Sequence, residues 1–305
     1  MTETPDIAQL NAQYALDGRL RFEAGPGGLP LAVISNRYAA AGVALLGGQA
    51  LAFQPHGAAP LLWTSRRSQY AVGKAIRGGV PICWPWFGPH PSDPARPNHG
   101  VVRTRLWQVR AAEAVGDGAT RLALGIADDP ITRALWPHAF DLEVRITVGA
   151  ELAVELVARN TGTEAFVCTG ALHSYFAVGD AAGVQIDGLD GRDYLDKAAG
   201  GRRATQRGPV TIAAETDRIY LDTTADCLIH DPALGRVIRV AKTGSRTTVV
   251  WNPWTEKARA LGDMDDNEYT GMVCVETANA DEDEITLAPG DEHRLGVTVR
   301  LEARG

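Results

Sequence analysis

Hydrophobic and polar residues alternate with a period of two along much of the chain. The clearest stretch runs from Asp141 to Arg159, where the apolar positions are Leu142, Val144, Ile146, Val148, Leu152, Val154 and Leu156. A period of two places every second side chain on one face of a β-strand, so residues 141–148 and 151–159 predict two half-buried strands. Gly149-Ala150 lies between them and predicts a two-residue hairpin connection.

Shorter apolar runs of the same kind, separated by glycine-containing turns, continue to the end of the chain. One pair flanks Gly116-Asp117-Gly118, which predicts a turn. Residues 187–209 are polar and rich in glycine, which predicts an exposed excursion. A helix is predicted only near the N-terminus, from about residue 5 to residue 15, because Thr4-Pro5-Asp6 is typical of a helix start.

Many short strands with few helices predict an all-β protein built as an antiparallel sandwich or barrel. No composition shift, repeat or low-complexity linker divides the sequence, so residues 1–305 are predicted to form a single domain. With 45% hydrophobic and 22% charged residues, the chain has the composition of a globular protein.

Charge and cysteine content narrow the function classes. The formal net charge of -7 argues against nucleic acid as a partner, which needs broad basic surfaces. No apolar run approaches the ~20 residues of a membrane span, and the N-terminus lacks a signal-peptide pattern. The cysteines (Cys83, Cys168, Cys227 and Cys274) are far apart and form no C-x-x-C pair, which argues against disulfides or a structural zinc site. We therefore expect a cytoplasmic protein without membrane or nucleic-acid partners, and a monomer by default.

One segment, residues 73–105, differs from the rest in charge and chemistry. It contains many glycines and prolines, which rule out a long helix, and the aromatic residues Trp84, Trp86 and Phe87. From Ser65 to Arg105 the only acid is Asp93, against the seven bases Arg66, Arg67, Lys74, Arg77, Arg96, Arg103 and Arg105. A cationic loop with aromatic residues on an acidic protein predicts a pocket for a small anion with an apolar or sugar-like face.

Other candidate residues lie on strand-like segments. His173 follows an apolar run in ALHSYFAV and is either a core histidine or a catalytic one. Glu276 lies in GMVCVET, where burial raises a carboxyl pKa and suits a general base. Asp217, in TDRIY, is either a turn residue or a ligand contact. Trp251 and Trp254 either pack in the core or stack on a sugar ring.

The order of five motifs makes the sequence similar to the hexose-6-phosphate mutarotases, the glucose-6-phosphate 1-epimerase branch of the aldose 1-epimerase family. The motifs are RGGVPICWPWFG (77–88), HGVVR (99–103), ALHSYF (171–176), TDRIY (216–220) and GDM…VCVETAN (262–279). The resemblance covers about residues 30–300. It implies a galactose-mutarotase-like antiparallel β-supersandwich with few short helices. We expect the reaction to need neither a metal nor a cofactor.

The resemblance also implies roles for seven residues. His173 and Glu276 match the catalytic pair, and the positions that match the sugar-phosphate site are Arg77, Asn98, His99, Arg103 and Asp217. The implied reaction is interconversion of the α and β anomers of a hexose 6-phosphate. Ring opening needs a base at the C1 hydroxyl, which we assign to Glu276, and an acid at the ring oxygen, which we assign to protonated His173.

Three alternatives remain open at this point. A mutarotase for unphosphorylated aldoses would need no basic segment. A non-catalytic carbohydrate-binding protein would need no acid–base pair. A glycoside hydrolase or lyase is the third, although a hydrolase would need two carboxylates that flank the scissile bond, and only Glu276 is a convincing candidate.

Overall fold

Two large antiparallel sheets form most of the fold. The structure is a computed structural model and describes residues 4–303. The first sheet has nine strands in the spatial order β16 (Val210–Thr211), β13 (Gln185–Asp187), β18 (Cys227–Asp231), β19 (Arg236–Thr243), β23 (Glu292–Leu301), β9 (Leu152–Asn160), β8 (Phe140–Val148), β7 (Ala119–Ala127) and β6 (Gln108–Val115). The predicted turn at residues 116–118 lies between β6 and β7.

Strands β8 and β9 confirm the clearest alternation in the sequence. Alternate side chains of β8 are buried along its whole length. The connection is one residue longer than predicted, because Val148 pairs with Leu152 and residues 149–151 form the turn. Gly149 donates its backbone N–H to the Glu151 carbonyl at 2.9 Å and closes this turn.

The second sheet carries the candidate catalytic residues. Its order is β15 (Arg202–Thr205), β14 (Asp193–Asp196), β17 (Thr216–Tyr220), β20 (Thr247–Asn252), β21 (Met272–Asn279), β11 (Gly170–Leu172) and β5 (Ile82–Cys83), and β12 (Tyr175–Ala177) also pairs with β21. The predicted exposed excursion over residues 187–209 therefore contains the strands β14 and β15, which the sequence did not indicate, and β15 is largely exposed as expected. Backbone pairing with β17 makes them strands although their side chains are mostly outside the core.

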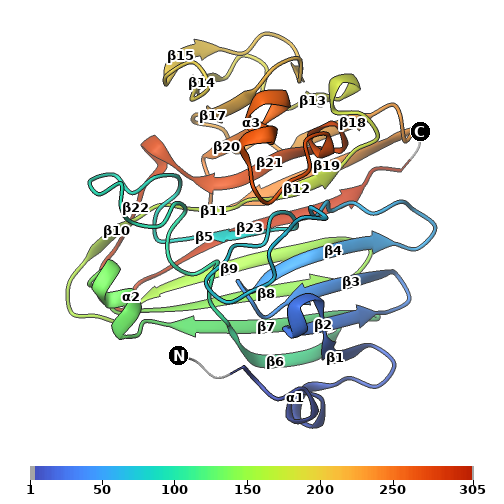
Figure 1. Cartoon of the computed structure of the whole chain (residues 1–305), viewed down its shortest axis with the longest axis vertical. Helices are drawn as coiled ribbons and strands as arrows, with labels where there is room; N and C mark the ends of the chain where they lie inside the picture. The colour runs from blue at the N-terminus through green and yellow to red at the C-terminus, as the bar shows by residue number, and fades with distance from the viewer. Residues whose placement is uncertain (1–3, 304–305) are drawn as a thin grey trace.

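Smaller elements complete the fold. A third sheet contains β1 (Leu20–Ala24), β2 (Pro30–Ser35), β3 (Ala39–Ala44) and β4 (Gln49–Pro55), and a ribbon contains β10 (Phe166–Cys168) and β22 (Ile285–Leu287). In Figure 1 the third sheet, in blue, lies beside β6–β9, and β3 contacts β8. The α-helices are α1 (Ile7–Tyr14), α2 (Pro130–Leu135) and α3 (Trp254–Ala260), and the 3₁₀ turns are Pro26–Gly28, Ala181–Gly183, Glu268–Gly271 and Asp281–Asp283.

Helix α1 confirms the predicted N-terminal helix, but the expected start at Pro5 was wrong, because the helix begins at Ile7. The Asp6 carboxylate accepts a hydrogen bond from the Gln9 backbone N–H at 2.9 Å, so Asp6 is the N-cap and Pro5 precedes it. Within residues 4–303, no helix combines the length and the apolar character needed to cross a membrane.

The hydrophobic core lies on one face of the second sheet. Val273 and Val275 of β21 and Val250 of β20 belong to the main buried cluster, which also contains β8, β9 and β23 residues. Because successive strand residues point to opposite faces, Met272, Cys274 and Glu276 lie on the other face of β21. That outer face bears the candidate active site.

Candidate active site

The register of the second sheet places His173 opposite Glu276. Strand β21 pairs with β11 through Leu172 and Thr277, and with β12 through Tyr175 and Cys274. Continuing either pairing by one or two residues brings His173 and Glu276 together. Directly opposed residues in an antiparallel pair have Cβ atoms about 5 Å apart, so the two side chains are neighbours on one face. Sheet pairing therefore joins two residues that are distant in sequence.

The side chains of His173 and Glu276 are close together but do not form a good hydrogen bond. His173 Nδ1 lies 3.4 Å from Glu276 Oε1, which is longer than a good charge-assisted hydrogen bond. Both residues are buried, with exposed fractions of 7% and 1%. His173 Nδ1 and Glu276 Oε2 are buried and have no hydrogen-bond partner among the described residues. Buried polar atoms of this kind are rare in folded proteins and are typical of a reactive site without its ligand.

Burial drives the pKa values of this pair in opposite directions. It lowers the pKa of His173 well below the ordinary value, and the positive charges of Arg103 and Arg77 lower it further. Burial also raises the pKa of Glu276 well above the ordinary value, helped by the negative charge of Asp217. Both shifts favour the uncharged forms, a protonated carboxyl group and an unprotonated imidazole. Divergent pKa values in neighbouring groups are typical of acid–base sites.

Further residues on the same face extend the site. Trp251 of β20 pairs with Cys274 on one side and with Asp217 of β17 on the other. The Tyr175 ring is stacked on the His173 ring, with centroids 4.7 Å apart and an interplanar angle of 7°. Trp251 packs against Cys274 and Tyr175 and also lines the cavity, so it serves both core packing and the binding surface.

The segment 73–105 covers this face and contains only the short strand β5. The backbone N–H of His173 donates to the Pro81 carbonyl at 3.0 Å, which ties the segment beside the catalytic candidates. Gly100 has a φ of 77°, and a Cβ there would overlap the carbonyl oxygen of Trp84. Only glycine fits this close approach, which positions the neighbouring His99.

A cavity of about 450 Å³ lies between the segment and the sheet. Its lining includes His173 and all five predicted substrate-binding residues, namely Arg77, Asn98, His99, Arg103 and Asp217. Glu276 lies directly behind His173 instead of on the wall. The structure thus brings together the seven residues that the sequence singled out.

His99 is held in one tautomer. Its backbone N–H donates to the Gly88 carbonyl at 2.8 Å, and its Nδ1 accepts from the Gly88 N–H at 3.2 Å. Since a backbone N–H can only donate, Nδ1 is unprotonated and the neutral ring carries its proton on Nε2. Burial and the nearby charges of Arg103 and Arg77 lower the pKa of His99 to about 3, which keeps the ring neutral.

Arg77 is fixed at the cavity wall. Its Nε donates to Asp263 Oδ1 at 2.7 Å, and Nη1 donates to the Tyr175 hydroxyl at 3.2 Å. Although burial opposes the charge, Tyr175 and Asp263 raise the pKa of Arg77 above its ordinary value. Arg103 donates to the Asn98 carbonyl at 2.9 Å, and within the described chain it makes no ion pair with a carboxylate. Both arginines also line a neighbouring cavity of about 300 Å³.

The basic segment, residues 65–105, offers fewer unpaired charges to a ligand than its sequence suggests. Four of its arginines pair with carboxylates away from the cavity: Arg66 with Glu268 and Asp265, Arg67 with Asp265, Arg96 with Asp93, and Arg105 with Asp129. Of the seven bases, only Arg77 and Arg103 line the cavity. The acids that neutralise the others are mostly far away in sequence, so the sequence window could not reveal them.

Sequence reasoning missed two lysines on the opposite wall. Lys197 and Lys257 line the cavity, and Lys257 Nζ lies 3.6 Å from Asp217 Oδ2 and 2.7 Å from Glu215 Oε1. Burial raises the pKa of Asp217, while Lys257 opposes this shift. Lys257 was hard to select from the sequence, because nothing in WNPWTEKAR indicated that the short helix α3 would place this lysine at the cavity.

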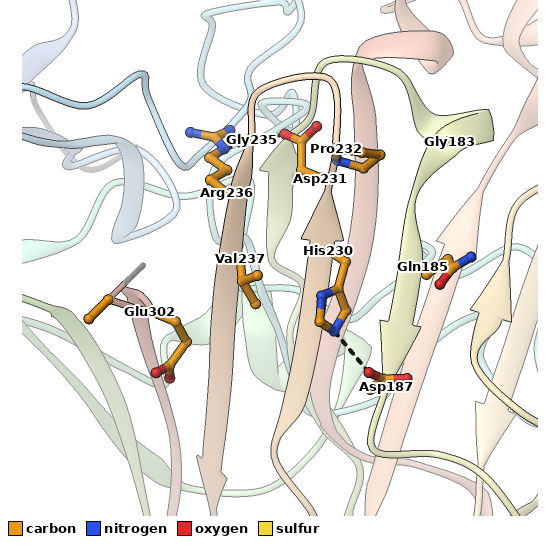
Figure 2. A pocket seen from close by; sticks show the side chains of 11 residues that line it. Gly183, Gln185, Asp187, His230, Asp231, Pro232, Gly235, Arg236, Val237 and Glu302 are labelled. Atoms are coloured by element: carbon orange, nitrogen blue, oxygen red, sulfur yellow. Dashed lines mark hydrogen bonds and ion pairs between the residues drawn. The ribbon is translucent and has the colours of Figure 1, made fainter. Parts of the chain in front are cut away.

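A larger cavity, of about 540 Å³, lies elsewhere at the ends of β13, β18 and β19 (Figure 2). Its charged groups are already paired: His230 Nε2 lies 2.8 Å from Asp187 Oδ2, and Arg236 Nε lies 3.3 Å from Asp231 Oδ2. The Arg236 guanidinium also donates to the carbonyls of Ala59, Pro60 and Ala177. This cavity is the larger of the two, but its lining contains no unpaired acid–base group comparable with His173 and Glu276.

The aldose 1-epimerase family matches residues 30–300 of the chain. A candidate glucose-6-phosphate 1-epimerase of Salmonella typhimurium is 38% identical over 253 residues, which cover 83% of this chain and 84% of that protein. The corresponding candidate enzyme of Escherichia coli is 35% identical over 277 residues, 90% of this chain and 92% of that protein.

Two solved structures have the same fold as this chain. A crystal structure of a candidate mutarotase from Salmonella typhimurium has a TM-score of 0.88 and 34% identity, and the alignment covers 98% of this chain and 99% of that one. A galactose mutarotase related enzyme from Lactobacillus acidophilus, 13% identical, shares the fold with a TM-score of 0.72, and 90% of this chain and 97% of that one are covered. The fold predicted from the sequence, a galactose-mutarotase-like β-supersandwich, is confirmed.

The fold and the matched family define an isomerase of the epimerase type. The chain belongs to the aldose 1-epimerase family.

Proposed function

We propose that this protein interconverts the α and β anomers of a hexose 6-phosphate, with glucose 6-phosphate as the substrate to test first. One observation carries the proposal. His173 and Glu276 form a buried cross-strand pair with unpartnered polar atoms, beside a cavity whose wall bears Arg77 and Arg103. The names of the two bacterial relatives, both candidate glucose-6-phosphate 1-epimerases, support the choice of substrate.

The chemistry needs one base and one acid. Removing the proton from the C1 hydroxyl while protonating the ring oxygen breaks the bond between C1 and the ring oxygen and gives the open aldehyde. Rotation about the C1–C2 bond exposes the other face of the aldehyde, and reversal of the proton transfers closes the other anomer. We assign Glu276 as base and His173 as acid, and the roles exchange on closure. Each proton transfer contributes about 10²–10⁴-fold.

Other residues on the wall bind and orient the sugar. Arg77 and Arg103 would hold the phosphate, because guanidinium groups match its oxygens in pairs. The fixed tautomer of His99 leaves its Nε2–H as a donor to a sugar oxygen. Asp217 would accept a hydrogen bond from a sugar hydroxyl, and Asn98 would contribute at the rim. Binding energy from the phosphate orients C1 against the acid–base pair.

The phosphate also supports the required proton arrangement. Without a bound anion, burial and the positive charges of Arg103 and Arg77 keep the His173 pKa low. A bound phosphate offsets those charges, so the pKa of His173 rises and the ring can carry a proton. Sugar hydroxyls that donate to the Glu276 carboxylate stabilise its ionised form. The substrate thus favours the ion pair that the assigned roles need.

A mutarotase for unphosphorylated aldoses is the second candidate, because the C1 hydroxyl and the ring oxygen, on which Glu276 and His173 would act, are present in both kinds of sugar. We also propose a cytosolic location, since the four cysteines are all free and buried in the described structure, which suits a reducing compartment.

Optical rotation tests the proposal directly. Freshly dissolved α-glucose 6-phosphate is followed with and without protein, and the same measurement is made with α-glucose. Faster equilibration of the phosphorylated sugar supports the proposal, and acceleration of glucose alone selects the second candidate. If neither sugar equilibrates faster, the chain acts as a binding protein and the proposal fails.

A further inference from the structure

Cys274 is a buried thiol beside the acid–base pair, and the proposed reaction does not use it. It lies on the same face of β21 as Glu276, two residues away, and pairs across the strands with Tyr175. One ligand atom from each of His173, Cys274 and Glu276 lies within 4.8 Å of the others, and all three residues are buried. We propose that this cluster is an inhibitory site for a soft divalent cation of the zinc class.

The geometry is close to that of a three-residue zinc site. With Zn–N and Zn–S distances of about 2.1 and 2.3 Å, tetrahedral ligand atoms lie about 3.5 Å apart. His173 Nδ1 and Glu276 Oε1 are already separated by 3.4 Å. Movement of the thiol sulfur by about an ångström closes the set, which side-chain rotation supplies. The fourth position is left for water or a ligand in the cavity, which His173 lines.

Two observations besides proximity support a ligand at this point. His173 Nδ1 and Glu276 Oε2 are buried polar atoms without a partner among the described residues, and both belong to the cluster. A cation bound to Nδ1 and to the carboxylate would give the imidazole nitrogen a partner and balance the carboxylate charge. The thiol and carboxyl groups release their protons to solvent on binding, so that one thiolate and one carboxylate neutralise a divalent charge and the imidazole stays neutral.

The donor set selects among metals. A thiolate and an imidazole favour zinc or cadmium, whereas magnesium and calcium prefer oxygen ligands. Occupation of the site would inhibit the enzyme, because the metal takes the His173 ring and the Glu276 carboxylate that the proton transfers need. The inhibition rests on the proposed function, but metal binding does not.

Cadmium is the probe for binding, because a cadmium–thiolate bond has an ultraviolet charge-transfer band. Titration of the full-length protein with cadmium chloride should produce this band with one equivalent. Cys274→Ser should abolish the band, whereas Cys83→Ser should retain it. Cys83 is the matched control, since it is also a fully buried thiol on this sheet but is outside the cluster. Absence of the band in the wild type, or its persistence in Cys274→Ser, would overturn the proposal.

Glu276→Gln provides a second variant in case Cys274→Ser folds poorly. Loss of one ligand should weaken cadmium binding by at least about tenfold, and unchanged binding contradicts the proposal. In the rotation assay, zinc should inhibit the wild type and magnesium should not. Equal inhibition by both ions would also overturn the assignment. Because the band is measured without substrate, its outcome separates failure of the metal site from failure of the proposed reaction.

Discussion

The imidazole of His173 lies parallel to the phenol ring of Tyr175, with centroids 4.7 Å apart, and the Tyr175 hydroxyl accepts a hydrogen bond from Arg77 at 3.2 Å. One side chain thus contacts the proposed acid with its face and the proposed phosphate ligand with its hydroxyl. Tyr175 is therefore a positioning residue that joins the two ends of the site.

Tyr175→Phe separates these two contacts. The ring still stacks on His173, but Arg77 loses a hydrogen bond worth about 1.5–3 kcal/mol to a charged group. We expect the KM for glucose 6-phosphate to rise about tenfold and kcat to change little. Tyr175→Ala removes the stacking as well and should also lower kcat. Steady-state rotation assays measure both constants, and an equal fall in kcat for the two variants contradicts the division of roles.

Glu276→Gln should abolish anomerisation while the protein stays folded. Loss of the base costs about 10²–10⁴-fold in rate, and the amide has nearly the same shape. Anomer exchange in NMR spectra measures the rate. A variant that retains most of its activity would rule out the carboxylate as base.

The same variant should respond differently to pH in unfolding. The pKa of Glu276 is raised above its ordinary 4.5, so between those two values the unfolded chain is ionised and the folded chain keeps its proton. The stability contributed by Glu276 is therefore present below pH 4.5 and is lost as pH rises toward the folded pKa. Denaturant titrations should show Glu276→Gln gaining stability relative to the wild type as pH rises from about 4.5 toward neutrality. Parallel pH profiles would contradict this.

Much of the fold could be predicted, because the alternation of buried and exposed residues along a strand can be recognised from neighbouring residues alone. The period of two in β8 and β9 marks which side chains are buried, and Asp6 with Pro5 marks the start of α1. Strands β14 and β15 were missed because their backbone pairing with β17, and not hydrophobic alternation, makes them strands.

The site was predictable as a set of residues but not as a geometry. Alternation shows that Cys274 shares a face with Glu276, and that Tyr175 shares a face with His173. It does not show that β21 pairs with β11 and β12, which is what brings His173 and Glu276 together. Motif resemblance selected the residues, and only the register shows Tyr175 and Cys274 beside them.

Arg103→Ala tests the phosphate contact. Removal of a charge-assisted hydrogen bond of about 1.5–3 kcal/mol should raise the KM for glucose 6-phosphate about 10–100-fold and leave kcat/KM for glucose nearly unchanged. Arg67→Ala is the matched control, because Arg67 belongs to the same basic segment but pairs with Asp265 outside the cavity. Similar damage with both sugars would argue against a phosphate role for Arg103.

Asp217→Asn tests a contact that both sugars share. The amide keeps the shape of the carboxylate but gives up its charge, so it binds a sugar hydroxyl less strongly. Lys257 loses its contact with the Asp217 carboxylate, 3.6 Å away, but keeps its ion pair with Glu215. We expect kcat/KM to fall by about tenfold for glucose 6-phosphate and glucose alike. Assays of both sugars in parallel measure this, and an effect confined to the phosphorylated sugar would place Asp217 at the phosphate instead.

The pH dependence of kcat should differ between the two sugars. His173 must be protonated to act as the acid, so activity is lost as pH rises through its pKa in the complex. Burial lowers that pKa, and so do the positive charges of Arg103 and Arg77. The neighbouring His99, Tyr175 and Cys274 stay neutral, because the pKa of His99 is lowered and those of Tyr175 and Cys274 are raised. A phosphate dianion offsets the arginine charges and glucose does not. The alkaline limb of kcat should therefore lie at higher pH for glucose 6-phosphate than for glucose. Coincident limbs for the two sugars in the wild type would show that the phosphate does not control the proton on His173.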